Sequence, residues 1–64
     1  MRNLEVTTET AGQSVSLIYP NERNPRIETS GEDCIVTFQD VPAGFTLTPT
    51  GTNDKIVAVI EMEI

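Results

Sequence analysis

The sequence predicts an all-β protein, a small antiparallel sandwich or barrel of five to six strands. Three observations support this fold class. Nine threonines stand against three alanines, and no window of a dozen residues keeps a helical stripe of apolar side chains free of glycine and proline. Apolar and polar residues instead alternate with a period of two in several short runs. Turn formers separate these runs at intervals of about ten residues. The order of the strands, a Greek key included, is left open.

The first two predicted strands lie in the first third of the chain. Residues 4–8 alternate, with leucine, valine and a threonine on one face and glutamate and threonine on the other. Residues 10–12 (Thr-Ala-Gly) are typical of a turn. In residues 13–19, valine, leucine and tyrosine alternate with two serines, while Ile18 falls on the polar face. Each strand therefore has one face suited to a core.

A loop and a short strand follow. Residues 20–25 begin and end with proline and contain asparagine, which predicts a loop. Residues 26–29 are expected to form an edge strand, because Pro25 at its first position needs no backbone N–H. After a turn at residues 30–33, Cys34 begins a strand and shares a face with valine and phenylalanine. We interpret Cys34 as a small buried hydrophobic residue rather than a reactive thiol.

A proline–glycine corner follows this strand, in the segment TFQDVPAGFTLTPTG. Pro42 fixes φ near −65°, as the second position of a tight turn requires, and Gly44 can adopt the positive φ that often follows. Val41 and Phe45 flank the corner and are expected to anchor it in the core. We therefore predict a structural corner rather than a binding loop.

Residues 34–51 combine a strand that ends in phenylalanine, an acidic-apolar-Pro-x-Gly corner, and a strand that opens with an aromatic residue and alternating threonines. This pattern resembles the strand–corner–strand of transthyretin-like Greek-key domains, including the B-type repeats of collagen adhesins. The matching residues are Phe38, Asp40, Val41, Pro42, Gly44, Phe45, Thr46, Leu47 and Thr48. The resemblance implies the local geometry of the corner. The adhesin repeats are longer, and many carry a Lys–Asn isopeptide bond with the lysine early and the asparagine late. The only lysine here, Lys55, lies in the last predicted strand.

The last predicted strand, residues 55–64, follows a hairpin turn at residues 51–54. One face is entirely apolar, and the valines on the other make the strand apolar on both sides through its first half. Such a strand lies at the centre of a sheet or has a face covered by a partner. We predict an interaction surface on this strand that Ile18 extends. Its residues are Ile18, Val57, Val59, Glu61 and Glu63. The alternative is that one small sandwich covers both faces internally.

Length and charge restrict the function classes. Sixty-four residues make one small β domain, residues 1–64, and such a chain buries only about 60% of its unfolded surface. Ten acidic against four basic residues give a net charge of −6, which argues against nucleic-acid partners and anionic membranes. The start has no apolar signal segment, and no run reaches the ~20 apolar residues of a membrane helix. We therefore expect a cytoplasmic protein.

No catalytic or cofactor set is recognisable in the sequence. Without histidine there is no ordinary Ser–His or Cys–His pair and no Cys/His zinc site, and there is no phosphate-binding glycine motif. We expect no enzymatic activity and no cofactor. The one metal alternative is calcium, if up-and-down strands bring two turns together. Its oxygen ligands would come from Glu32, Asp33, Asn53 and Asp54.

Two functions fit these properties. The first is a non-enzymatic β module that acts through protein–protein contact, as a homo-oligomer or as a subunit of a larger assembly. The alternative is a small acidic inhibitor, like those of phages and mobile elements, that occupies a basic surface of a target enzyme. The acidic residues are spread along the chain rather than gathered in a stripe, which favours the first function.

Overall fold

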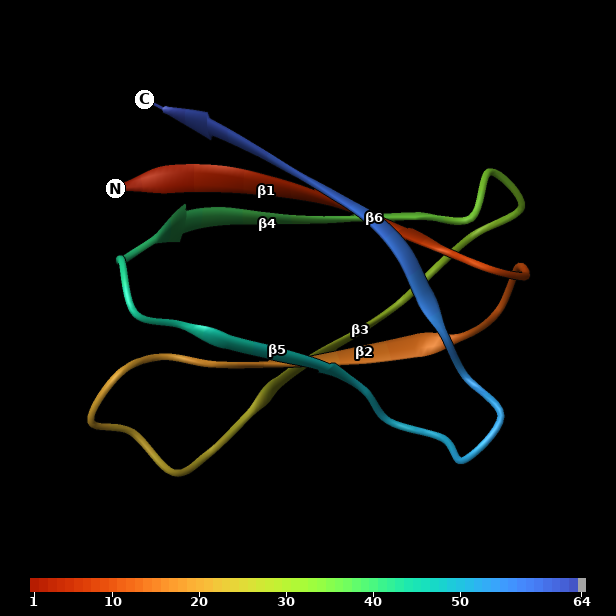
Figure 1. Cartoon of the computed structure of the whole chain (residues 1–64), viewed down its shortest axis with the longest axis horizontal. Coiled ribbons are helices and arrows are strands. Elements are labelled where there is room, and N and C mark those ends of the chain that lie inside the picture. The colour runs from red at the N-terminus through yellow and green to blue at the C-terminus, as the bar shows by residue number, and fades with distance from the viewer. Residues whose placement is uncertain (64) are drawn as a thin grey trace.

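The fold consists of two three-stranded antiparallel sheets that lie face to face (Figure 1). The structure is a computed structural model and describes residues 1–63. Its strands are β1 (Arg2–Thr8), β2 (Ser14–Ile18), β3 (Arg26–Thr29), β4 (Ile35–Val41), β5 (Thr46–Pro49) and β6 (Ile56–Glu63). The sheets have the orders β4-β1-β6 and β3-β2-β5 and do not close into a barrel. The all-β prediction is confirmed as a sandwich-like arrangement. Across the residues described, no helix has the length and apolar character needed to cross a membrane.

The hydrophobic core lies between the two sheets and follows the predicted alternation. β1, β2 and β4 each turn alternate apolar side chains inward, because successive side chains of a strand point to opposite faces. The buried members are Leu4, Val6, Val15, Leu17, Val36, Phe38 and Val41. Each fully buried side chain of this kind contributes roughly 1.5–3 kcal/mol relative to exposure, so this small set carries most of the hydrophobic stabilisation.

Two buried hydroxyl groups close one end of the sandwich. Thr8, on the predicted inward face of β1, donates a hydrogen bond to Ser30 Oγ at 2.9 Å. The Ser30 hydroxyl also accepts from Gln13 N at 3.2 Å and donates to Gln13 O at 3.1 Å. Both hydroxyl groups are therefore satisfied despite their burial, as buried polar groups require.

The proline–glycine corner has the predicted positive φ at its glycine. Gly44 has a φ of 90°, Val41 is fully buried, and Phe45 is half-buried against the core. The structure adds a bulge just before the corner, because β1 residues Arg2 and Leu4 pair with Val41 and Phe38. The extra residue lets Phe38 and Val41 both face inward.

Cys34 differs from its predicted position. It lies in the turn before β4 with a φ of 63°, and the strand begins one residue later. Its backbone N–H donates to Gly31 O at 3.0 Å, and its carbonyl accepts from Thr8 N at 2.8 Å. Cys34 is half-buried rather than fully buried, because the turn removes it from the inward row of β4.

Candidate functional site

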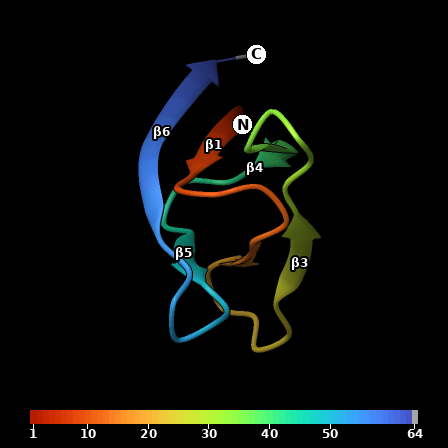
Figure 2. The ribbon, with the colours of Figure 1, turned by 90° about the vertical axis from the view of Figure 1, so that its right-hand side faces the viewer.

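The sandwich has two open sides, because each sheet ends in two edge strands. On one side β3 lies across from β4, and on the other β5 lies across from β6 (Figure 2). The two sides are built differently, and this difference identifies the candidate site.

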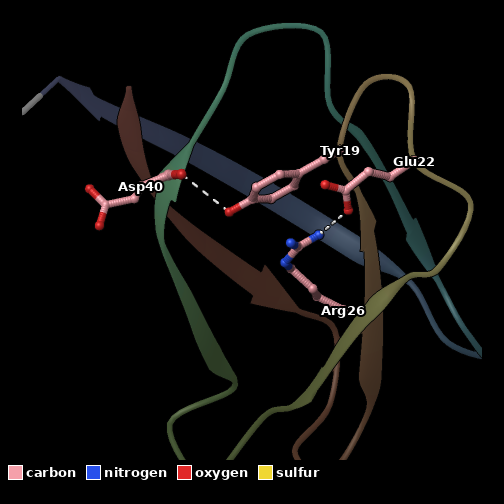
Figure 3. A network of polar contacts seen from close by, with 4 residues as sticks. All are labelled: Tyr19, Glu22, Arg26 and Asp40. Carbon is pink, nitrogen blue, oxygen red and sulfur yellow. Dashed lines mark hydrogen bonds and ion pairs between the residues drawn. The ribbon is translucent and has the colours of Figure 1, made fainter.

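The side between β3 and β4 holds the smaller groove, of about 410 Å³, and polar side chains bridge it. The Arg26 guanidinium lies 3.6 Å from the centroid of the Tyr19 ring and pairs with Glu22 at 2.9 Å. The Tyr19 hydroxyl donates to Asp40 O at 3.1 Å, which joins the end of β2 to the opposite sheet (Figure 3). The edge strand β3 has only four residues, preceded by Pro25. A short strand with nearby proline and charge is a poor template for a further strand.

The side between β5 and β6 is open. A groove of about 620 Å³ runs between these strands, with apolar side chains along it and charged residues at its rim. Its lining consists of Phe45, Leu47, Pro49, Asp54, Lys55, Ile56, Val59 and Glu61. Part of this groove was not predicted from the sequence, because the alternation of residues 45–49 does not reveal which strand lies across from them.

The β6 strand is an edge strand, so of the two alternatives that the sequence left open, a position at the centre of a sheet is wrong. Within residues 1–63 it pairs with β1 alone. Val57 is 53% exposed, Val59 42%, Ile60 52% and Met62 45%. Residues 1–63 therefore leave these apolar side chains of β6 partly exposed on both faces.

A bulge in β6 decides which side chains face the groove. Thr7 pairs with Ala58 and Thr8 with Ile56, so Val57 is an extra residue. Ile56 therefore lies on the inward face with Thr8, although the sequence alternation groups it with Ala58. This is a correction to the predicted continuous apolar face, and its cause is the one-residue shift.

Beyond the bulge, β6 alternates regularly. Val59 pairs with Val6 and Glu61 with Leu4, so both lie on the inward face. Ile60 pairs with Glu5 on the outward face. Outward Met62 and inward Glu63 continue this alternation, with Met62 opposite Asn3 and Glu63 opposite Arg2. The Glu61 carboxylate also forms an ion pair of 2.7 Å with Arg2.

The structure brings together four of the five predicted interface residues. Val57, Val59, Glu61 and Glu63 all belong to β6. Ile18 lies in β2, in the sheet that does not contain β6. It is half-buried, pairs with Thr46 of β5, and does not extend the β6 surface.

The proposed calcium ligands do not form a site. Asp33 accepts a hydrogen bond from Ile35 N at 3.1 Å, and Asp54 accepts one from Gly51 N at 2.9 Å, so each carboxylate closes its own turn. The other two candidate ligands are Glu32 and Asn53. In residues 1–63 no three acidic, cysteine or histidine side chains come together in a way that could hold a metal ion. The two turns lie at the same end of the sandwich, because β4 and β6 both begin beside the end of β1. They lie at opposite edges of it, however, since one leads into β4 and the other into β6. In Figure 2 these edges are on opposite sides.

Comparison of the chain with protein-family models, curated proteins and solved structures finds no match. The resemblance of residues 34–51 to transthyretin-like domains stays a prediction.

Proposed function

We propose that this protein is a non-enzymatic β module that binds another polypeptide along β6. The observation that supports the proposal is an eight-residue edge strand with exposed apolar side chains on both faces. Edge strands present unpaired N–H and C=O groups on their outer side, and an added strand can pair with them.

The energetics favour a partner for this edge. A 64-residue domain has a total stability of roughly 3–10 kcal/mol at 0.05–0.15 kcal/mol per residue. Completing the burial of even one half-exposed apolar side chain contributes on the order of 1 kcal/mol. Burial by a partner would therefore add a free energy that is substantial beside the folding stability of the chain. The side chains concerned are Val57, Val59, Ile60 and Met62.

The small acidic inhibitor ranks second. Glu22 and Glu61 already form ion pairs with arginines, while Asp33 and Asp54 accept hydrogen bonds in their own turns. These carboxylates are used within the chain and do not form a row that imitates a polyanion.

The proposal is tested by site-specific photo-cross-linking in the cells that produce the protein. A photoreactive amino acid replaces Ile60 in β6 or, as the control, Thr37 in β4. Both positions pair with Glu5, so they lie on the same outward face at the two opposite edges of one sheet. We expect a heavier covalent adduct from position 60 and none from position 37. Equal adducts from both positions, or none from position 60, would contradict the proposal.

A further inference from the structure

We infer that the partner of β6 is a second copy of this chain, and that the two β6 strands pair antiparallel about a two-fold axis. The inference rests on the proposed function, in that β6 must be the binding edge. It adds the identity of the partner and the direction of pairing, which the exposed apolar edge alone does not give.

The charges at the ends of β6 support antiparallel pairing with a second copy. Lys55 directly precedes the strand, and Glu61 and Glu63 lie at its other end. In residues 1–63 no carboxylate lies within 4.0 Å of the Lys55 ammonium group, because the ion pairs found there are Arg2–Glu61 and Arg26–Glu22. Antiparallel pairing brings each Lys55 to the acidic end of the other strand, whereas parallel pairing sets the acidic ends against each other.

The position of Lys55 at the start of the strand is fixed by its backbone. Its carbonyl accepts from Glu9 N at 2.9 Å, and its N–H donates to the Gln13 side chain at 3.2 Å. The exposed side chain therefore projects from a defined point beside the edge, where a charge on a second copy can meet it.

A two-fold axis at Val59 also matches the faces of the two strands. Such an axis pairs residues at equal distances on either side when the extra residue Val57 is left out of the count, so outward side chains meet outward side chains. Ala58 then lies opposite Ile60 of the second copy, and Lys55 lies opposite Met62, between Glu61 and Glu63 of the second copy. Opposite charges on neighbouring positions of paired strands are favourable, and the symmetry brings a Lys55 ammonium beside these carboxylates at both ends of the pair.

The assembly stops at two copies for a structural reason. Joining the β6 edges of two three-stranded sheets gives one continuous sheet of order β4-β1-β6-β6-β1-β4. Its new outer edges are the β4 strands, and both β6 edges are covered. An interface that contacts itself across a two-fold axis is closed, so a third copy finds no free β6 edge.

The net charge of −6 on each copy opposes association. Salt screens this repulsion between dispersed charges over about 8 Å at physiological ionic strength, so we expect a reversible dimer that forms more readily in salt than in dilute buffer.

The test is sedimentation equilibrium of the full chain and four variants. Lys55→Glu turns the attraction at both ends of the paired strands into repulsion, and we expect it to raise the dimer Kd at least about tenfold. Arg23→Glu in the exposed loop before β3 makes the same change in net charge and should alter Kd less than about threefold. Adding Glu63→Lys to Lys55→Glu should restore the wild-type Kd, whereas adding Glu32→Lys at the same net charge should not.

The outcomes separate this inference from the proposed function. A wild type that stays monomeric at every accessible concentration overturns the second copy, and an adduct at position 60 with a different protein would then leave the proposed function standing. Absence of both the dimer and any adduct overturns both. A dimer that Lys55→Glu does not weaken more than Arg23→Glu, or that Glu63→Lys does not rescue, overturns antiparallel pairing of β6.

Discussion

Replacing Val57 by glutamate is expected to leave the fold intact while abolishing association. Val57 is 53% exposed and is the extra residue of the β6 bulge. About half of its side chain contributes to folding, so the loss is about 0.8 kcal/mol, taking roughly 1.5 kcal/mol for complete burial of a valine. This is a small part of the roughly 3–10 kcal/mol expected for the domain. The new carboxylate stays in water within the monomer but would be desolvated in the interface.

Val6→Glu is the matched control. Val6 has no exposed surface, although it lies in the adjacent strand of the same sheet, opposite Val59. A carboxylate there is buried without a partner, at a cost of several kcal/mol, and the domain should unfold.

Thermal unfolding followed by circular dichroism at low concentration measures the first effect, and sedimentation measures the second. We expect Val57→Glu to lower Tm by less than about 8 °C, since 1 kcal/mol shifts a domain of this size by about 4–8 °C. It should also sediment as a monomer at concentrations where the wild type is associated. An unfolded Val57→Glu chain would refute the exposed position of Val57, and a folded variant that associates like the wild type would refute its role in the interface.

Two further predictions concern the corner and the side of the sandwich between β3 and β4. Gly44→Val should cost about 1–3 kcal/mol because its φ of 90° is strained for a β-branched residue, although an added Cβ would lie 3.6 Å from Pro20 without a clash. Gly31→Val, where φ lies outside that region, is the control in urea unfolding, and equal costs would contradict the argument. Tyr19→Phe should cost about 0.5–1.5 kcal/mol by removing the hydrogen bond to Asp40 O, and Tyr19→Leu more, since Arg26 then loses the ring beneath it. Equal stability of the phenylalanine and leucine variants would contradict a role for the ring.

The predicted strands show how far local pattern reaches. Leu4, Val15 and Val36 lie in runs whose alternation marks one apolar face, and the structure buries that face in each case. The turn at Gly44 was also predictable, because the need for positive φ is a property of a few neighbouring residues. Asp40 adopts a φ of 58° in a bulge that the neighbouring residues do not predict, since the bulge depends on pairing with β1.

The last strand shows where local pattern fails. Alternation places Ile56 and Ile60 on one face, but the extra residue at Val57 puts them on opposite faces of the sheet. Ile18 and Val57 both interrupt a polar pattern, yet they belong to different sheets. The register and sheet of each residue follow from partners that are distant in the chain.

The sequence by itself determined the class of fold, the position of most strands and turns, and the apolar character of β6. These properties depend on the side-chain period of a strand and on the conformations open to proline and glycine, which are local. Only the tertiary structure decided that β6 is an edge, that its inward face borders a groove with β5, and that Arg26 and Tyr19 line a smaller groove on the opposite side. The physical reason is that a run such as IVAVI satisfies the centre of a sheet and its edge equally well, and the choice between them is made by which other strands pair beside it.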